Sequence, residues 1–417
     1  RELQFKPIRY PRSKCDITIQ DKKGCQRYIG TVVENVTNKP TKDRIKKRLN
    51  SIGNRSINNI VDITNFVLME VGQPLHAFDY DKLIGGEVIV RRAKKGERIV
   101  ALDNNEYKLD DSVLVIADAK RQIAIAGIMG GKQAEVTALT KNVLLESAYF
   151  DPVLIRKTAR KLGLSSDSSY RFERGVDTQG VKKGSERALS LILETAGGKI
   201  IKHSDMRFDK KDNKKHSIHI STERINTYLG SDIKMTKIQE MLKKLDFQVT
   251  RRGKNTLRVS PPSHRSDINC EVDIIEEVAR IEGYDKLPTS LPTVTFTIVA
   301  PEKKRLYRNQ IKKELMNQGY NEIITYSTTN QRALDRVQQG HLFSSSITNP
   351  LSMDQERMRP SMLPGMLNVI SFNLNRNQKS LRLFETGKIY IKEDEIETLS
   401  LALVGQAYDD WRLKDNM

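Results

Sequence analysis

The fold class is decided by a stretch of two apolar runs joined by a polar turn, SVLVIADAKRQIAIAGIMGG, residues 112–131. Residues 112–117 and 122–128 are rich in Val, Ile and Ala and predict two strands, and residues 118–120 supply the turn of a hairpin. Comparable runs bounded by turn residues occur on both sides of this hairpin, at residues 27–36, 87–92, 98–102, 106–109 and 142–147. The sequence therefore predicts a β-rich unit.

Helical patterns flank these strands and make the class α+β. Thr41 is the expected N-cap of a helix over residues 41–50, and Gly72 ends a short helix over residues 65–71. Downstream, the pattern predicts a helix that begins with Asp151 as cap and Pro152 at its first position, a polar loop over 165–169, and a helix to Ala196.

The chain of 417 residues is long enough for several domains. A Lys- and Asp-rich stretch and a Pro-rich stretch read as linkers. Between them, two amphipathic helices, two strands and a further helix ended by Gly283 follow a winged-helix-like order. The predicted organisation is an extended arm at 1–24, an α+β domain at 25–205, a linker at 206–217, a winged-helix-like domain at 218–290 and a last domain at 291–417.

Composition limits the function classes. The formal charge of +19 favours a polyanionic partner, with nucleic acid as the leading candidate. No apolar run approaches the ~18 residues that a membrane helix needs. The three cysteines, at irregular spacing, form neither a disulfide framework nor a zinc pair, and this favours a cytoplasmic location.

Four carboxylates near one predicted helix form a candidate metal site: Asp267, Asp273, Glu276 and Glu277. The last three lie at i, i+3 and i+4, on one stripe of the helix. An all-oxygen set suits a hard cation such as Mg²⁺. The same pattern also fits an acidic first turn favoured by the helix dipole, with Glu276 paired to Arg280 on the surface.

Three polar residues at the ends of the short predicted helix form a second candidate site. Thr64, Asn65 and His76 would converge on one cleft, where His76 positions a substrate group or water. The alternative is structural, with Thr64 or Asn65 as a helix cap and His76 as a hydrogen-bonded core residue.

Further candidates lie on the β-rich unit and in the polar loop. Glycines after an apolar strand either turn a hairpin or let a ligand approach the backbone. Glu146, inside an apolar run, either lies on the solvent-facing side of a strand or is a buried polar group that binds a hydroxyl or amine. The sequence lacks a GxSxG nucleophile elbow, a P-loop and a GxGxxG motif. The residues concerned are Ala126, Gly127, Gly130, Glu146, Ser166 and Ser168.

Taken in order, several motifs resemble the β subunits of bacterial phenylalanine–tRNA ligases. The resemblance covers the chain from about residue 25 to its end. The motifs are NNIVDITNFV at 58–67, GQPLHAFD at 72–79, YRFERGVD at 170–177, EEVARIEGYD at 276–285, NPLS at 349–352, RPSMLPG at 359–365 and RLFETG at 382–387.

The resemblance implies a mixed α/β editing domain, a winged-helix-like metal-binding domain and part of a class II synthetase-like antiparallel sheet domain that performs no aminoacylation alone. It also implies that the family's N-terminal tRNA-binding module and C-terminal anticodon-binding domain have no counterpart here, and that the catalytic-like domain is cut near Trp411.

The resemblance also implies roles for the candidate residues. Thr64, Asn65, His76 and Glu146 would carry the hydrolysis of tyrosine from mischarged tRNA(Phe), with Glu146 recognising the tyrosine hydroxyl. Ala126, Gly127, Gly130, Ser166 and Ser168 would bind the substrate, and Ser168 stands where the family is expected to have Ala. Asp267, Asp273, Glu276 and Glu277 would bind Mg²⁺.

The implied assembly is an α2β2 synthetase, in which the α subunit charges tRNA(Phe) at the expense of ATP. One alternative is a scaffold that holds the α subunit and tRNA and has an inactive editing pocket. Another is a DNA-binding protein built on the winged-helix-like unit, which predicts salt-dependent duplex binding without residues 25–205.

Overall fold

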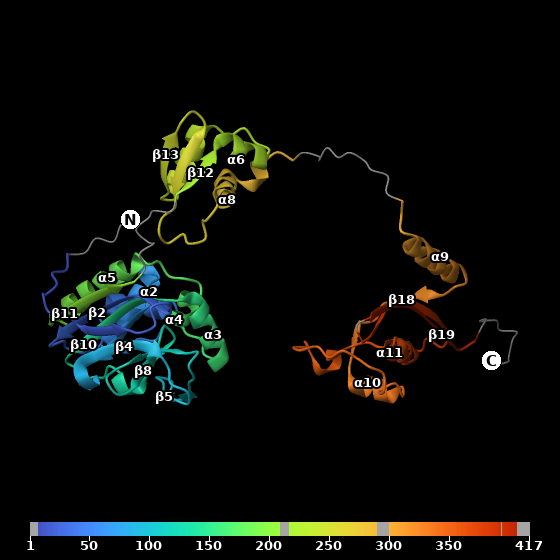
Figure 1. The fold of residues 1–417 in the computed structure, drawn as a ribbon, viewed down its shortest axis with the longest axis horizontal. Coiled ribbons are helices and arrows are strands. Elements are labelled where there is room, and N and C mark those ends of the chain that lie inside the picture. Colours follow the sequence, from blue (N-terminus) through green and yellow to red (C-terminus); the bar gives the residue numbers. More distant parts are fainter. Residues whose placement is uncertain (1–6, 209–216, 290–299, 393, 407–417) are drawn as a thin grey trace. The chain divides into compact units, whose positions relative to one another are not determined.

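The computed structural model describes residues 7–208, 217–289, 300–392 and 394–406. The chain forms two compact units, residues 1–291 and 292–417, and each is described by itself (Figure 1). The α+β prediction is confirmed, because each unit contains both helices and sheets.

An antiparallel sheet and the helices packed against it form the centre of the first unit. Its order is β11-β2-β10-β3, and α2 and α5 lie against one face (Figure 1). On β10, Val143 and Leu145 pack among the helices, whereas Leu144 and Ala148 pack on the other side, as the two-residue period of a strand requires. The elements are β2 Cys25–Glu34, α1 Asp43–Ser51, α2 Asn59–Val71, β3 Leu75–Asp79, β10 Val143–Phe150, α5 Gly180–Thr195 and β11 Lys199–Arg207.

A second, mixed sheet in the order β1-β4-β7-β8-β9 covers the opposite face of β2 and β10. A short hairpin of β5 and β6 and the helices α3 and α4 complete this side. The elements are β1 Asp16–Ile19, β4 Glu87–Arg92, β5 Arg98–Val100, β6 Glu106–Lys108, β7 Leu114–Ala117, β8 Gln122–Ile125, β9 Met129–Gly130, α3 Pro152–Leu162 and α4 Asp167–Phe172.

The extended arm expected at residues 1–24 is corrected at residues 16–19, which belong to a sheet. Residues 16–19 form β1, which pairs in parallel with β4 from Asp16↔Glu87 to Ile19↔Val90. Ile17 and Ile19 alternate with exposed residues and are buried in the core, so this segment is an edge strand of the second sheet.

Three further expectations in this unit are corrected. Lys42, and not Thr41, holds the N-cap position of α1, and the Thr41 hydroxyl donates to Asp62 Oδ2. The short helix expected over 65–71 begins at Asn59, because the Asn58 side chain accepts hydrogen bonds from the backbone N–H groups of Ile60 and Val61. The polar loop expected over 165–169 contains the start of α4, where Ser166 and Ser169 form a reciprocal capping box.

Residues 217–289 form a small three-stranded sheet in the order β12-β14-β13, packed with three helices around one core. Two helices, two strands and a further helix follow in the expected order, but the strand β12 before them was not expected. Likeness to a winged helix stays a prediction. The elements are β12 Ile218–Ser221, α6 Thr222–Leu229, α7 Met235–Lys244, β13 Gln248–Arg252, β14 Thr256–Ser260 and α8 Glu271–Glu282.

The second unit contains a three-stranded sheet, β15-β18-β19. The expected antiparallel sheet is mixed, because β15 pairs in parallel with β18. Residues 323–327 form no strand and lie between two short strands, β15 and β16. The elements are α9 Lys303–Asn317, β15 Asn321–Glu322, β16 Thr328–Thr329, α10 Gln331–Arg336, β17 Arg357–Met358, α11 Leu363–Leu374, β18 Leu381–Ile391 and β19 Asp394–Val404.

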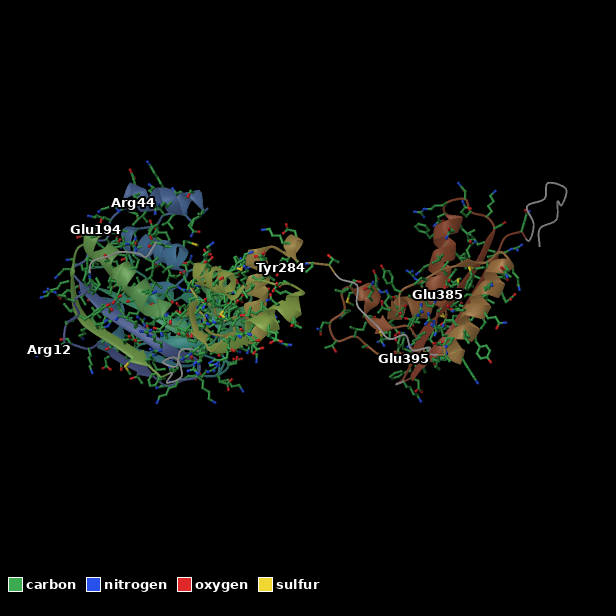
Figure 2. All side chains as sticks on the ribbon, turned by 90° about the horizontal axis from the view of Figure 1, so that it is seen from above. Arg12, Arg44, Glu194, Tyr284, Glu385 and Glu395 are labelled. Atoms are coloured by element: carbon green, nitrogen blue, oxygen red, sulfur yellow. The ribbon has the colours of Figure 1, made fainter. Side chains whose placement is uncertain are left out.

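An ion pair with very little solvent exposure lies inside the second unit. Arg359 Nη1 is 2.9 Å from the Oε1 atom of Glu385, a residue labelled in Figure 2. The guanidinium also donates to Thr325 Oγ1 and to the carbonyl of Lys388, so the charge is well satisfied. Two sequence motifs that suggested the family therefore meet at one structural contact.

Most residues of the two expected linkers fall in the ranges 209–216 and 290–299, which lie outside the described residues. Trp411 also lies outside them. At the boundary, residues 206–207 belong to β11, which pairs with β2. Among the described residues, no helix combines the length and the apolar character that crossing a membrane requires.

Candidate functional site

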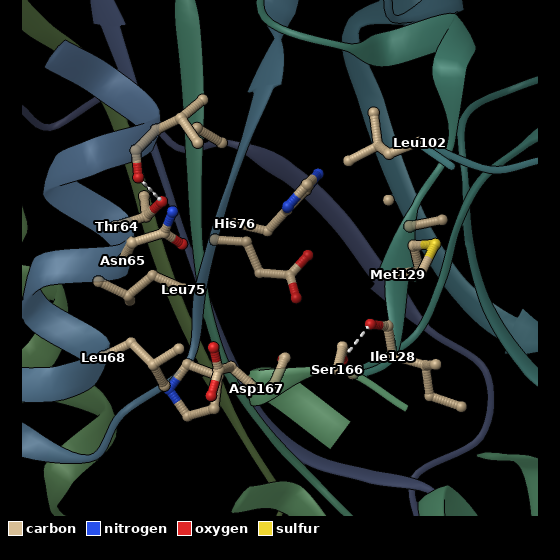
Figure 3. A pocket seen from close by; sticks show the side chains of 18 of the residues that line it. Thr64, Asn65, Leu68, Leu75, His76, Leu102, Ile128, Met129, Ser166 and Asp167 are labelled. Carbon is tan, nitrogen blue, oxygen red and sulfur yellow. Dashed lines mark hydrogen bonds between the residues drawn. The ribbon is translucent and has the colours of Figure 1, made fainter. Parts of the chain in front are cut away.

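A cavity of about 420 Å³ lies in the first unit, between α2, the strands β3, β8, β9 and β10, and α4 (Figure 3). This volume lies within the range of small-molecule sites. Eight of the nine candidate pocket residues line it: Thr64, Asn65, His76, Gly127, Gly130, Glu146, Ser166 and Ser168. Ala126 does not line it and is buried beside Gly127.

Helix α2 supplies Thr64 and Asn65 from its middle, so neither residue is the helix cap. The Thr64 hydroxyl donates to the carbonyl of Val61 at 2.7 Å, which leaves its oxygen able to accept a hydrogen bond. Figure 3 shows Thr64, Asn65 and Leu68 on one side of the cavity, with Leu102, Ile128 and Met129 on the other. The cavity therefore has two polar groups, Thr64 and Asn65, on its helical wall and apolar side chains on the opposite wall.

Strand pairing brings the two most distinctive residues together. Glu146 on β10 lies directly opposite His76 on β3 in the antiparallel register. Side chains at such positions share one face, with Cβ atoms about 5 Å apart. The sequence placed these residues seventy positions apart, and the sheet makes them neighbours.

The imidazole of His76 is uncharged at neutral pH, because burial lowers its pKa to about 4. Its ring packs edge-on against Phe78, with ring centroids 4.5 Å apart. A Cβ atom at Gly130 would lie 2.5 Å from His76 Cε1, so a glycine is required for the ring to lie against the backbone there. This contact fixes the position of the imidazole in the cavity.

The carboxyl group of Glu146 is buried, as one of the two interpretations of the sequence required. The solvent-facing alternative is excluded because the residue is only 5% exposed. Burial raises its pKa to about 8, whereas a hydrogen bond from Tyr28 lowers it. The Tyr28 hydroxyl donates to Glu146 Oε2 at 2.9 Å. At neutral pH the Glu146 side chain is therefore largely protonated and faces the cavity as a neutral hydrogen-bonding group.

Gly127 and Ser166 shape the wall near α4. Gly127 has φ +69°, and a Cβ there would crowd Phe150, Ile155 and Phe172. The Ser166 hydroxyl donates to the carbonyl of Ile128 at 2.7 Å and also caps α4 (Figure 3). Ser166 is therefore occupied in holding the wall together.

The apolar part of the lining was missed by sequence reasoning. These side chains come from several elements, and each also fits an ordinary core position, so only their position at the cavity distinguishes them. They include Leu68, Leu75, Leu102, Ile116, Met129 and Phe172. The serine spacing at 166 and 169 was the one local signal that could have predicted α4.

Three of the four candidate metal ligands near α8 already have ion-pair or hydrogen-bond partners within the chain. Arg265 Nη2 lies 2.6 Å from Asp267 Oδ2 and 2.7 Å from Glu277 Oε1, and Arg280 also pairs with Glu277. Asp273 accepts hydrogen bonds from the backbone N–H groups of Asn269 and Cys270. The expected Glu276–Arg280 pair is replaced by Glu277–Arg280, and Glu276 is exposed.

These contacts lower the pKa values of three carboxyl groups. The Arg265 hydrogen bond lowers the pKa of Asp267, and the backbone N–H of Asn269 lowers that of Asp273. At Glu277, burial opposes the effect, and the Arg265 and Arg280 hydrogen bonds outweigh it.

In the described ranges, no three His, Cys, Asp or Glu residues are grouped to hold a metal ion. The four carboxylates as arranged, with a guanidinium between two of them, do not fit a magnesium cage. Mg²⁺ binding stays a prediction from the resemblance, and no chemical step is assigned to it.

Comparison with known proteins covers most of the chain. Family models match the B3/4 domain at residues 24–197, the tRNA synthetase B5 domain at 218–284, and the phenylalanyl tRNA synthetase beta chain CLM domain at 287–416. The phenylalanine–tRNA ligase beta subunit of Carboxydothermus hydrogenoformans is 42% identical over 405 residues, covering 95% of this chain and 50% of the relative. The chain belongs to the phenylalanine–tRNA ligase β-subunit family.

Other β subunits of the family agree. The Moorella thermoacetica protein is 42% identical, with 88% of this chain and 46% of the relative aligned. The Thermotoga maritima protein is 39% identical, with 94% and 50% aligned. The chain thus spans about half the length of the curated relatives it matches. The cavity lies in the segment matched by the B3/4 model, and the acidic cluster lies in the B5 match.

A solved N-terminal fragment of the phenylalanyl-tRNA synthetase beta subunit from Pyrococcus horikoshii is 16% identical. The alignment covers 67% of this chain and 79% of the fragment, with a TM-score of 0.32, which is too low to carry an argument. Membership of the β-subunit family, expected from the motifs, is confirmed by the sequence relatives.

Proposed function

We propose that this chain is part of a phenylalanyl-tRNA synthetase β subunit and that its cavity hydrolyses the ester that links a mistaken tyrosine to tRNA(Phe). The observation that carries the proposal is Glu146, a buried carboxyl group that lines the cavity opposite the uncharged imidazole of His76. In this proposal the Glu146 carboxyl group recognises the tyrosine hydroxyl, and His76 lies where the ester would be held.

Recognition of tyrosine follows from the cost of an unpaired buried polar group. A tyrosine side chain offers Glu146 a hydroxyl partner, and a phenylalanine side chain leaves the carboxyl group without one. Sites built to pair a substrate hydroxyl reject the analogue that lacks it strongly. The apolar wall with Leu102 and Met129 accommodates the rest of the ring.

Hydrolysis requires a water molecule to attack the ester carbonyl while the leaving oxygen of the terminal ribose takes up a proton. A pKa near 4 makes His76 a weak base, so its role is to orient the water or the ribose hydroxyl. The Ser166 hydroxyl donates to the backbone carbonyl of Ile128, and no basic side chain among the described residues accepts its proton, which argues against a covalent serine nucleophile. Positioning therefore supplies the rate acceleration.

The same proposal includes tRNA(Phe) and the α subunit of an α2β2 enzyme as partners. The charge of +19 supports a tRNA partner. Leu399, Leu401 and Leu403 expose apolar side chains along one face of β19, which supports a protein partner for the second unit. Sedimentation of the chain with and without the α subunit tests assembly, and an unchanged sedimentation coefficient would contradict it.

The editing activity is tested by incubating the chain with tyrosyl-tRNA(Phe) and measuring deacylation, beside the variants Glu146→Ala and His76→Ala. We expect hydrolysis above the uncatalysed rate for the wild-type chain and a loss of about 100-fold in each variant, because each removes a positioning or recognition group.

Binding of tRNA is measured in parallel. Hydrolysis at the background rate with tRNA binding intact would support the scaffold with an inactive pocket and contradict the editing proposal. Salt-dependent binding of duplex DNA that does not need residues 25–205 would support the DNA-binding alternative.

A further inference from the structure

The carboxyl group of Glu146 is in contact with a residue outside the cavity lining, Tyr28. Tyr28 on β2 is fully buried, and its hydroxyl donates to Glu146 Oε2 at 2.9 Å. The antiparallel register sets Tyr28 opposite Ala148 and Gly30 opposite Glu146, so Tyr28 is the diagonal neighbour of Glu146 on the same face. Gly30 has no side chain to intervene between them.

This contact makes the two oxygens of Glu146 unequal. Oε2 is occupied by the Tyr28 hydroxyl, and no described residue donates a hydrogen bond to Oε1. A carboxyl group with one oxygen held can present only the other to a ligand in the cavity. The orientation of the Glu146 carboxyl group is thus set by Tyr28 on β2, whose side chain packs on the face of the sheet opposite α2.

We propose that Tyr28 is a positioning residue that fixes the Glu146 carboxyl group so that its Oε1 atom meets the hydroxyl of a bound tyrosine. The inference rests on the proposed editing function and deepens it. Tyr28 is not among the residues that line the cavity, so in this proposal it acts through Glu146.

The protonation states favour this role. Burial, together with the nearby Glu146 carboxyl group, raises the pKa of Tyr28 well above its usual value, so the phenol stays a hydrogen-bond donor. Because Tyr28 donates to Oε2, the proton of neutral Glu146 is directed to Oε1.

Several other titratable groups lie around Glu146. Cys25 on β2 is close to it, and His76 on β3, Asp167 on α4 and Glu135 line the same cavity. Burial raises the pKa of Cys25 well above its usual value and lowers that of His76 to about 4. Of Glu146, Cys25 and His76, Glu146 is the group that titrates near pH 8.

The test compares wild type, Tyr28→Phe and Glu146→Gln in deacylation of tyrosyl-tRNA(Phe) and phenylalanyl-tRNA(Phe), with uncatalysed hydrolysis subtracted and pH varied. In the wild type we expect the ratio of kcat/KM for the two substrates to change through pH 8. In Tyr28→Phe the ratio falls about five- to tenfold, the worth of one hydrogen bond. The inflection also moves to higher pH, because the donor that lowers the Glu146 pKa is gone. Glu146→Gln has no such inflection.

The matched control is Tyr107→Phe, which removes a hydroxyl bonded to Asp103 outside the cavity lining and should change neither the ratio nor the inflection. An equal loss on both substrates in Tyr28→Phe, or an unchanged ratio and inflection, overturns the positioning role while leaving the editing function in place. A wild-type chain that hydrolyses neither substrate overturns the editing function, and the inference falls with it.

Discussion

Glu146 and the acidic residues near α8 have opposite surroundings. In the cavity of residues 7–208, Glu146 has an uncharged phenol as its partner, and burial raises its pKa to about 8. Near α8, Asp267 and Glu277 share the guanidinium of Arg265, and the hydrogen bonds from arginine lower their pKa values.

The difference is that Glu146 has no cationic partner, whereas Asp267 and Glu277 already share one. A buried carboxyl group without a cation keeps hydrogen-bonding capacity for a ligand, at the cost of being largely neutral. Carboxylates already paired with arginine contribute to the stability of the folded chain. Both groups drew attention in the sequence because they are acidic, and their partners decide what each can do.

The largest expected effect comes from closing the gap between Gly130 and His76. In Gly130→Ala the new Cβ would lie 2.5 Å from His76 Cε1, so the imidazole must move. We expect deacylation of tyrosyl-tRNA(Phe) to fall about 100-fold, because a displacement of about 1 Å is enough to disturb positioning catalysis. Single-turnover kinetics measures the loss.

The control for this variant is Gly53→Ala. Gly53 has φ +82° and nothing within 4 Å of an added Cβ, so alanine there strains the backbone and leaves the cavity alone. It should lower the free energy of unfolding by about 1 kcal/mol and leave the rate unchanged. Equal deacylation rates in Gly130→Ala and wild type would show that catalysis does not depend on the position of the His76 imidazole.

A smaller effect, on stability and not on rate, is expected at the acidic cluster. Arg265→Ala leaves Glu277, with its side chain only 7% exposed, short of one partner. We expect the free energy of unfolding to fall by about 2–3 kcal/mol, less than the full penalty of a broken buried pair because Arg280 remains. Urea denaturation measures the change.

Arg98→Ala is the matched arginine variant. Its pair with Glu106 is well exposed on both sides, so its loss should cost less than about 1 kcal/mol. If Arg265→Ala were no more destabilising than Arg98→Ala, the structural role of the cluster would be wrong. A gain in Mg²⁺ binding by Arg265→Ala, seen in calorimetric titration, would show that the guanidinium competes with the metal.

Much of the cavity was predictable because its polar residues lie in short motifs. Thr64, Asn65 and His76 stand close together in the sequence, and Glu146 was conspicuous inside an apolar strand. Their local structure was harder: the helix around Thr64 begins earlier than expected, because its cap at Asn58 lies outside the apolar run that suggested the helix.

The remaining features depend on contacts between distant segments. Tyr28 and Glu146 are 118 residues apart, and β1 becomes a strand only through its pairing with β4. The spacing of the acidic residues is limited in the same way, since spacing on a helix shows which carboxylates are near one another and not which arginine neutralises them. Periodicity carries no information about such partners.

The most direct test of the central claim is the preference of the chain for tyrosyl-tRNA(Phe) over phenylalanyl-tRNA(Phe), measured as the ratio of kcat/KM for wild type and Glu146→Ala. If Glu146 reads the tyrosine hydroxyl, the wild-type chain prefers the tyrosyl substrate, and the variant loses about 100-fold of that preference. A variant that keeps the wild-type preference would contradict the account.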